Sequence, residues 1–575
     1  MTPLHRLAEA AGVARDWTDA DGVTRTVSDD SLRAVLNALG LAANNESDIS
    51  KSLHEIARRR AAQPRMVTAD VNQPINIDDI FSESRLVDEG GSVIAMDLAT
   101  LRRSGLPQPG YYRLENGAQT VHIAVSPKAC RTLPRRCWGV AIQIPSLRGD
   151  GAFGDFAALA QAVSQLGAHG ADAVALSPVH ALNIDDPGRF APYSPSSRIA
   201  LNALLGAADT APSESDLIDW TAAGPAKLAA LRTRFDAAGE SDFAAFLQSH
   251  ARAGLDTVQQ AARDAGMAIG LITDLAVGVD PAGADAQGQP DAFLQGLRIG
   301  APPDPLGPLG QDWGLTSYSP QDLIDSGFAP FIAMLRANLP QGGGIRIDHA
   351  FSLQRLWVVP EGRPASEGAY LAYPFADLLR LIKLEAWRAD AIVIAEDLGT
   401  RPPGFSDALA RAGVHGMAVL PFARDEDGAF LPAEDYPPTS IAMTATHDTA
   451  TVAGWWTGRD LDWNRKLDRG GDSPDRRATD RAALWQAIGS GAPQPADDDP
   501  APVIDAALAF LARTPAPLLI VPMEDLAGLA EQPNLPGTVD EHPNWRRRLP
   551  APVAALLARA DIVRRIDSLN EERGG

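Results

Sequence analysis

The stretch GIRIDH (residues 344–349) and the stretch AIVIAED (residues 391–397) indicate the fold of this chain. Each is a short apolar run that ends in an acidic residue, Asp348 in the first and Glu396 in the second. Short runs rich in β-branched residues are typical of strands buried on both faces of a parallel sheet. Long helical stretches separate these runs from their neighbours, which predicts strands alternating with helices.

Six further runs repeat this pattern, so the chain offers eight candidate strands in all. They are Trp138–Ile144, Ala173–Leu176, Ala268–Leu275, Gly344–Ile347, Ala391–Ala395, Gly416–Leu420, Ser440–Ala445 and Pro517–Val521. Eight parallel strands, each followed by a helix, close into a barrel. The sequence therefore predicts an α/β protein with a (β/α)8 TIM barrel and a small accessory region of helices and β-structure before it.

The predicted division has three parts: a helical region over 1–62, a small β-rich module over 63–134, and the catalytic barrel over 135–575. The helical region contains expected helices at 28–40 and about 50–61, and turn-bounded β-like runs begin at Met66. Uneven spacing between the barrel strands predicts large insertions near 182–262, 278–341 and 454–513. Insertions after strands build the active-site face of this architecture.

Composition limits the partners of the protein. Among 575 residues, 73 Asp and Glu against 51 Lys and Arg give a formal net charge of -22, so nucleic acid and anionic membranes are not expected as partners. Cys130 and Cys137 are the two cysteines of the sequence, too few for the disulfide framework of a secreted protein. No leader or membrane-spanning stretch is apparent, and we expect a cytoplasmic protein.

Acidic residues follow the ends of four predicted strands. Asp274 ends the third run, Asp348 the fourth, Glu396 the fifth and Asp448 the seventh. One acid at such a place is often the N-cap of the next helix. Four of them in one barrel are harder to explain by capping, because all four converge on the face where barrel enzymes carry their active sites.

Two of these acids are predicted to work as a pair. Strand alternation places Arg346 on the same side as Asp348, where its guanidinium can keep the carboxylate ionised as a nucleophile requires. Retaining glycoside cleavage needs a second carboxyl, protonated near neutral pH, about 5–5.5 Å away. Neighbouring strands are about 4.8 Å apart, so Glu396 on the fifth strand can meet that separation.

Histidines and aromatic side chains near the acids suit sugar binding. His349 and His447 stand beside Asp348 and Asp448 and can donate hydrogen bonds to hydroxyls, and Tyr193 and Trp313 can stack on pyranose rings. A metallohydrolase site is the alternative, because His and Asp at strand ends also bind zinc. We favour the site without metal or cofactor, since several histidines placed as ligands are missing from the pattern.

Several motifs of the chain resemble the 4-α-glucanotransferases, the amylomaltase or disproportionating-enzyme family of glycoside hydrolases, and within it the bacterial maltose-system branch. They are APYSPSSR (191–198), DLAVGV (274–279), PPDPLGPLGQDWG (302–314), GGIRIDH (343–349), RLWVVPEG (355–362), IAEDLGTRP (394–402), TATHDTAT (444–451) and NLPGT with HPNW (534–545). They span most of residues 138–550 in the family's order.

The resemblance implies a role for each matching residue. It implies that Asp348 is the nucleophile, Glu396 the general acid/base and Asp448 the stabiliser of the transition state. It further implies sugar binding by a larger set: Tyr193, Asp274, Asp304, Gln311, Trp313, Arg346, His349 and His447.

The predicted function is retaining transfer of an α-1,4-glucan segment from a donor maltodextrin to the 4-hydroxyl of a glucose or oligosaccharide acceptor, through a covalent glycosyl–Asp348 intermediate and without a cofactor. Two alternatives stay open at this point. An α-amylase-type hydrolase would use the same three acids and let water compete. A carbohydrate-binding protein would keep the barrel without activity, although it would have no need of paired catalytic carboxyls.

Overall fold

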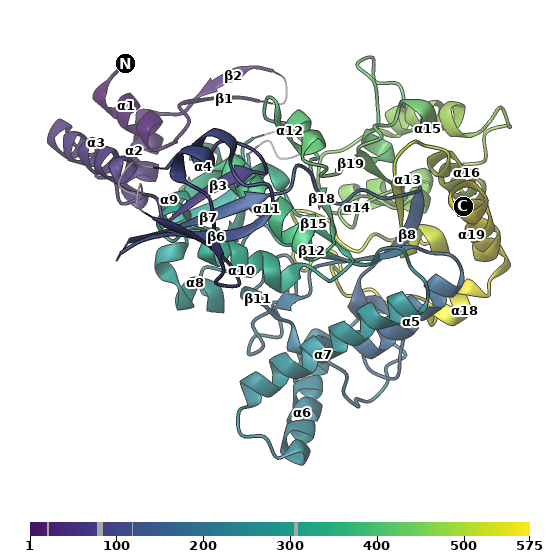
Figure 1. The fold of residues 1–575 in the computed structure, drawn as a ribbon. Helices are drawn as coiled ribbons and strands as arrows, with labels where there is room; N and C mark the ends of the chain where they lie inside the picture. Colours follow the sequence, from purple (N-terminus) through teal and green to yellow (C-terminus); the bar gives the residue numbers. More distant parts are fainter. Residues whose placement is uncertain (20–21, 78–83, 118, 304–308, 575) are drawn as a thin grey trace.

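A barrel of eight parallel strands forms the centre of the molecule (Figure 1). The computed structural model describes residues 1–19, 22–77, 84–117, 119–303 and 309–574. The barrel strands are β8 (Cys137–Ile142), β9 (Ala173–Leu176), β12 (Gly270–Leu275), β15 (Gly344–Ile347), β18 (Ile392–Ala395), β19 (Gly416–Val419), β20 (Ser440–Met443) and β21 (Leu518–Pro522). All eight predicted strands are present, and the predicted fold class is confirmed.

Neighbouring strands of the barrel are consecutive in the chain. The sheet order is β18, β15, β12, β9, β8, β21, β20, β19, with every pairing parallel. The circle closes between β18 and β19. There the His415 N–H donates to the Val393 carbonyl at 2.9 Å, and the Ala395 N–H donates to the His415 carbonyl at 2.7 Å. The acid-bearing ends of the strands therefore gather at one mouth.

Burial on both faces explains why these runs are mainly apolar. In β18, Ile392 and Ile394 belong to the cluster that fills the barrel interior, whereas Val393 packs outside against the helices. The helices are amphipathic and cover the outer face: α5 (Phe156–Ala168), α7 (Phe243–Asp264), α10 (Ala329–Asn338), α11 (Phe375–Arg388), α12 (Phe405–Arg411), α16 (Ala501–Ala512) and α19 (Ala560–Arg573). Asp155 caps α5 by accepting from two backbone N–H groups of its first turn.

The first part of the chain packs on a second sheet. α1 (Pro3–Ala10), α2 (Asp29–Ala38) and α3 (Glu46–Ala61) share one apolar cluster with this four-stranded antiparallel sheet. Its order is β14 (Gln311–Leu315), β13 (Leu297–Ala301), β16 (Arg355–Pro360) and β17 (Ala369–Ala372). α2 lies within its predicted span, with Ser28 as its cap. α3 begins four residues earlier than expected, because the Asn45 side chain caps it by accepting from the Asp48 N–H.

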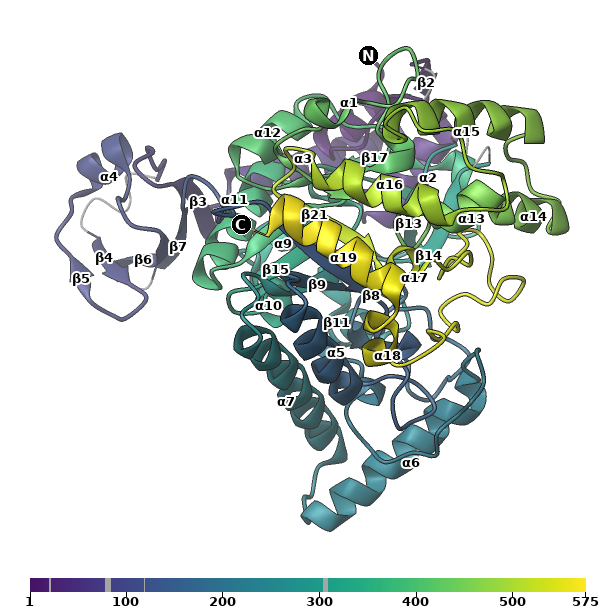
Figure 2. The same ribbon diagram turned by 90° about the vertical axis from the view of Figure 1, so that its right-hand side faces the viewer.

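A five-stranded sheet stands apart from the barrel and projects from the molecule (Figure 2). It runs in the order β3 (Met66–Asp70), β7 (Gln119–Ser126), β6 (Gly110–Asn116), β4 (Arg85–Asp88) and β5 (Val93–Ile94), with the short helix α4 (Leu98–Ser104) beside it. Polar contacts attach it to α11. Asp70 accepts from Arg380 at 3.1 Å and from Lys383, and the Tyr111 hydroxyl donates to Glu385 at 2.5 Å. The proposed boundaries at 62 and 134 stay a prediction.

Each predicted insertion contains secondary structure of its own. Between β9 and β12 lie the antiparallel pair β10 (His180–Ala181) and β11 (Ser197–Leu201) and the long helix α6 (Trp220–Ala238), which projects with α7 (Figure 2). Between β12 and β15 lie β13, β14, α8 (Ala284–Gly288) and α9 (Pro320–Asp325) before α10. Between β20 and β21 lie α13 (Val452–Thr457), α14 (Arg459–Lys466) and α15 (Pro474–Ile488) before α16.

The structure bears on two expectations from composition, the state of the cysteines and the presence of membrane-spanning helices. Cys130 and Cys137 are both free and buried. Among the helices of the described ranges, none has both the length and the apolar character needed to cross a membrane.

Because β8 and β9 lie very close together at Gly139, we expect Gly139→Ala to lower the free energy of unfolding. A Cβ at Gly139 would lie 2.4 Å from the carbonyl oxygen of Ala173, its partner on the next strand. Backbone atoms inside a closed barrel cannot move aside cheaply, so we expect a loss of about 1–3 kcal/mol in unfolding free energy, measured by urea denaturation. Gly288→Ala is the control, because its Cβ would meet nothing within 4 Å. Equal stability of the two variants would contradict the prediction.

Candidate active site

Four acidic residues gather at the mouth of the barrel, as the sequence predicts for its strand ends. Asp274 lies in β12 and pairs in register with Arg346 of β15. Asp348 and Glu396 directly follow Ile347 and Ala395, which are partners in the β15–β18 ladder, and the Glu396 N–H donates to the Ile347 carbonyl at 2.9 Å. Adjacent parallel strands thus present the two carboxylates side by side.

Arg346 is the electrostatic centre of the cluster. Its Nη1 atom donates to both oxygens of Asp274 at 2.7 and 2.9 Å and to Asp348 Oδ1 at 3.0 Å. Burial raises the pKa of Asp274, and the guanidinium opposes that shift. The predicted pairing of Arg346 with Asp348 is present, and Asp274 shares the same cation.

Two backbone N–H groups hold the carboxyl of Glu396. Its Oε2 accepts from the His349 N–H and its Oε1 from the Leu398 N–H, both at 2.9 Å. Burial, with the nearby charge of Asp348, raises the pKa of Glu396 to about 7, although Arg346 and these N–H groups act in the opposite direction. A carboxyl with this pKa can both give and take a proton near neutral pH.

His349 takes a backbone conformation that serves Glu396. Its φ of 44° lies in the left-handed region, which is uncommon for a residue other than glycine. This turn directly follows Asp348, and the His349 N–H is the one that donates to Glu396. Burial lowers the pKa of its imidazole to about 4, so the ring is neutral at pH 7. Backbone strain next to the two carboxylates is typical of a functional site.

Asp448 lies beyond the end of β20 and has two polar partners. His447 Nε2 is 3.3 Å from its Oδ2, and the Asn534 side-chain amide donates to its Oδ1 at 2.6 Å. Although burial acts against the charged form, these partners lower the pKa of Asp448, so the carboxylate is ionised at neutral pH. The charge of Asp448 in turn raises the pKa of His447.

Tyr193 and His447 form part of a ring cluster beside the acids. Their rings stack with centroids 4.7 Å apart, and Trp545 lies against both, at 5.6 and 5.3 Å. The Tyr193 hydroxyl donates to Asp274 at 2.5 Å. Tyr193 therefore connects Asp274 with His447, which follows β20.

Gln311 and Trp313 approach the site from β14. The Trp313 ring meets the His349 ring edge-on at 5.1 Å, and its Nε1 donates to Gln311 Oε1 at 3.0 Å. Asp304, predicted to bind sugar, lies outside the described residues. Trp456 is fully buried and its Nε1 donates to the Ala496 carbonyl, so its ring is not available to stack on a sugar.

The metal alternative finds no support in the described parts of the chain. There, no group of three or more His, Cys, Asp or Glu side chains is placed to hold a metal ion. The histidines near the acids are committed to other contacts, since His349 packs against Trp313 and His447 against Tyr193. Independence from cofactors stays a prediction.

Three residues of this region were not predicted individually. Asn534 and Trp545 fall inside the quoted stretches NLPGT and HPNW, so their motifs could have indicated them. Glu524 follows the end of β21, and the rule applied to the other strands would have found it there. Burial raises its pKa to about 7, with the charge of Asp525 adding to the shift.

The raised pKa of Glu396, the general acid that the resemblance implies, predicts the pH dependence of the expected reaction. A general acid must be protonated before the first step, and its protonated fraction falls about tenfold for each pH unit above the pKa. We expect kcat/KM for an oligosaccharide to fall in this way above about pH 7. Measured pH profiles should lose this limb in Glu396→Gln, and a limb that survives in the variant would assign it to another group.

Comparison with known proteins agrees with this geometry. A family model described as 4-alpha-glucanotransferase matches residues 142–240 and 210–554. A 4-alpha-glucanotransferase of Mycobacterium tuberculosis is 30% identical over 97% of this chain and 96% of its own, and one of Haemophilus influenzae is 28% identical over 99% and 98%. The crystal structure of amylomaltase from Corynebacterium glutamicum superposes with a TM-score of 0.88 at 26% identity, covering 98% of this chain and 99% of that one. The chain belongs to the 4-alpha-glucanotransferase family, glycoside hydrolase family 77.

Proposed function

We propose that this protein is a 4-α-glucanotransferase, which moves a segment of an α-1,4-glucan from a donor maltodextrin to the 4-hydroxyl of a glucose or oligosaccharide acceptor. The observation that carries the proposal is the pairing of Asp348 with Glu396 on adjacent strands, one beside Arg346 and the other with a pKa of about 7. Strand spacing of about 4.8 Å suits the separation of about 5–5.5 Å that retaining enzymes use.

In the first step, Asp348 attacks the anomeric carbon while Glu396 donates its proton to the departing glycosidic oxygen. The bond from carbon to Asp348 forms as the glycosidic bond breaks, which leaves a covalent glycosyl ester and a shortened donor product. Asp448 is ionised and lies at the same mouth, so its charge can stabilise the positive charge that develops on the sugar ring.

In the second step, Glu396 acts as a base. It removes the proton from the acceptor 4-hydroxyl, whose oxygen attacks the anomeric carbon and releases Asp348. A pKa near 7 suits both steps, because the same carboxyl must be protonated in one and ionised in the next. No cofactor enters this sequence, since acid, base and nucleophile are all side chains of the chain.

We assign sugar binding to the polar and aromatic groups around the acids. Trp313 and Gln311 offer a ring and an amide from β14, and His349 and His447 offer ring N–H groups. Asp274 accepts hydrogen bonds from both Tyr193 and Arg346, so we assign Asp274 and Tyr193 to holding the cluster as well as to contacting sugar. We also assign sugar binding to Asp304, because the motif PPDPLGPLGQDWG (302–314), which contains it, resembles the family's.

Incubation of the purified protein with maltotriose tests the proposal. Transfer produces glucose together with a ladder of longer glucans, whereas the α-amylase-type alternative produces only shorter sugars. No change in the sugar would support the carbohydrate-binding alternative. Products are resolved by length, and an Asp348→Asn sample shows whether any change comes from a contaminating enzyme.

The location of the protein in the cell is also a proposal. Both cysteines are free, which suits the reducing cytoplasm. Fractionation of the producing cells with an antibody against the chain would test this assignment.

A further inference from the structure

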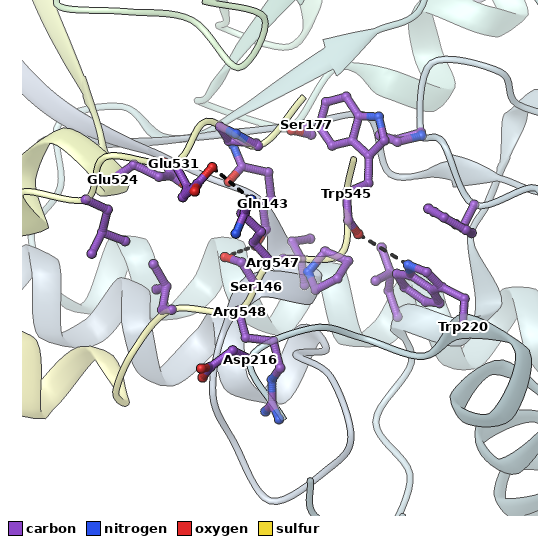
Figure 3. A pocket seen from close by; sticks show the side chains of 18 of the residues that line it. Gln143, Ser146, Ser177, Asp216, Trp220, Glu524, Glu531, Trp545, Arg547 and Arg548 are labelled. Atoms are coloured by element: carbon purple, nitrogen blue, oxygen red, sulfur yellow. Dashed lines mark hydrogen bonds and ion pairs between the residues drawn. The ribbon is translucent and has the colours of Figure 1, made fainter. Parts of the chain in front are cut away.

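An open cavity lies across the barrel mouth from Asp348 and Glu396, among the loops that follow β8, β9 and β21. Figure 3 shows Glu524 and Trp545 among the residues that line it. The side of the mouth that carries the two carboxylates is packed instead. There the ring of Phe351, to which the proposed chemistry assigns no role, joins the segments that follow β15 and β18.

Phe351 lies in a short 3-10 helix that begins directly after His349. The helix spans Ala350–Leu353, and Phe351 is only 5% exposed within the apolar cluster between the barrel and its helices. The Ala350 N–H donates to the Glu396 carbonyl at 2.9 Å, which ties the start of this helix to the end of β18. The backbone therefore holds the Phe351 side chain in one place beside the two catalytic segments.

The first contact of Phe351 is with the imidazole of His349. The two rings meet edge-on with centroids 5.6 Å apart, and Trp313 meets the same imidazole edge-on at 5.1 Å. The backbone of His349 is left-handed, and such a conformation persists only where the surrounding contacts hold it. The two rings therefore help to fix the turn whose N–H donates to Glu396.

The other contacts of Phe351 are with the segment that follows Glu396. Phe405, the fully buried first residue of α12, meets Phe351 edge-on at 5.3 Å and stacks on Phe375 at 5.4 Å. A Cβ added at Gly399 would lie 3.8 Å from the Phe351 ring, so the ring also passes close to the backbone of Gly399. This glycine directly follows Leu398, whose N–H donates to Glu396.

Phe351 therefore touches both segments that supply backbone donors to Glu396. The His349 N–H lies on the segment after β15, and the Leu398 N–H lies on the segment after β18, each 2.9 Å from a carboxyl oxygen. Because the donors come from different strands, their simultaneous approach to one carboxyl depends on how closely the two segments pack. Phe351 is the ring between them.

The two donors act on Glu396 together with its charged neighbours. Asp348 raises the pKa of Glu396, and Arg346 lowers it. The His349 imidazole is neutral at pH 7, whereas its N–H and that of Leu398 both favour the carboxylate and lower the pKa of Glu396. Loss of the donors would therefore raise this pKa further.

We propose that Phe351 is a positioning residue, whose ring keeps the His349 and Leu398 N–H groups within hydrogen-bonding distance of Glu396. The proposal rests on the proposed function only for the role of Glu396 as acid and base. When the ring is removed, the two segments can separate, and the carboxyl loses part of its donor set.

Hydrogen exchange at the His349 and Leu398 amides, followed by mass spectrometry with fragmentation to single residues, tests the proposal without turnover. In Phe351→Ala both amides should exchange about tenfold faster than in the unmutated protein, because their hydrogen bonds to a carboxylate are weakened. Phe331→Ala is the matched control. Phe331 is also 5% exposed in the same apolar cluster but lies in α10, so its removal should leave these two amides unchanged.

The alkaline limb of kcat/KM for maltotriose, which we expect from Glu396, is the second readout. It should move to higher pH by about 0.5 unit or more in Phe351→Ala and stay in place in Phe331→Ala. A purely structural effect would lower the amount of active protein without moving the limb. Phe351→Leu keeps most of the apolar volume and should show the same two changes at smaller size, so it carries the test if Phe351→Ala does not fold.

Two results would overturn the positioning role. One is unchanged exchange with an unmoved limb in Phe351→Ala, or in Phe351→Leu if only that variant folds. The other is a limb that moves to lower pH, because Phe351 would then act by keeping water away from the carboxyl.

The outcomes separate this proposal from the proposed function. A protein that performs no transfer from maltotriose would refute the transferase, and the exchange of the two amides would still decide the role of Phe351. Transfer activity with unchanged exchange and an unmoved limb would refute the positioning role alone.

Discussion

Asp348→Asn is expected to abolish glucan transfer, with a loss in kcat of roughly 10⁴-fold or more, the order seen when a nucleophile is removed from an enzyme. The amide has nearly the shape of the carboxylate but cannot form the glycosyl ester, so neither step of the reaction can proceed. The loss should be the same for every leaving group. Initial rates with maltotriose and with an aryl α-maltoside measure it.

The control for this variant is an exposed acid away from the barrel mouth, such as Glu434→Gln. Its rates should equal those of the unmutated protein. Circular dichroism checks that Asp348→Asn is folded. We expect it to fold, because the contact of Arg346 with Asp274 does not involve Asp348. Transfer at more than about a hundredth of the normal rate would remove Asp348 from the role of nucleophile.

Glu396→Gln should produce a loss that depends on the leaving group. The amide has nearly the shape of the carboxyl and can accept one of its two backbone hydrogen bonds, but it has no acidic proton to give, and general acid catalysis contributes about 10²–10⁴-fold. Maltotriose, with a poor leaving group, should lose that factor. An aryl α-maltoside with an activated leaving group needs little protonation, so the release of its phenol should be affected far less.

The two variants must therefore differ in their profiles. Release of the activated phenol measures the first step, and product length with maltotriose measures the whole reaction. If Glu396→Gln lost the same factor with both substrates, the acid/base role would have to pass to another group. Glu524, with its pKa of about 7, would then be tested in the same way.

The barrel was predictable because its strands are buried on both faces. The run 391–395 is apolar at every position and the other barrel strands are mainly apolar, which is a strong signal even without periodicity. The sheet of β13, β14, β16 and β17 was not predicted. Its strands are short and lie inside insertions, and the run Arg355–Pro360 resembles any other buried segment until its antiparallel partners are known.

The acids of the site were predictable from their places at strand ends, whereas their partners were not. Sequence spacing placed Arg346 beside Asp348, but the sharing of its guanidinium with Asp274 depends on the register between β12 and β15. The contact of Asn534 with Asp448 joins residues 86 positions apart. No local pattern reports such a pairing, because it arises from the parallel pairing of β20 with β21.

The shared guanidinium of Arg346 has a consequence for the covalent stage of the proposed reaction. When Asp348 becomes a glycosyl ester, it gives up its negative charge, and a cation that served it alone would be left without a counterion in a buried place. Asp274 already holds the same nitrogen at 2.7 Å, so the arginine keeps an anion through the whole cycle. Because Glu396 loses its proton as Asp348 loses its charge, the net charge of these groups is the same at the ester stage, and the cluster that receives the acceptor is the one that released the donor.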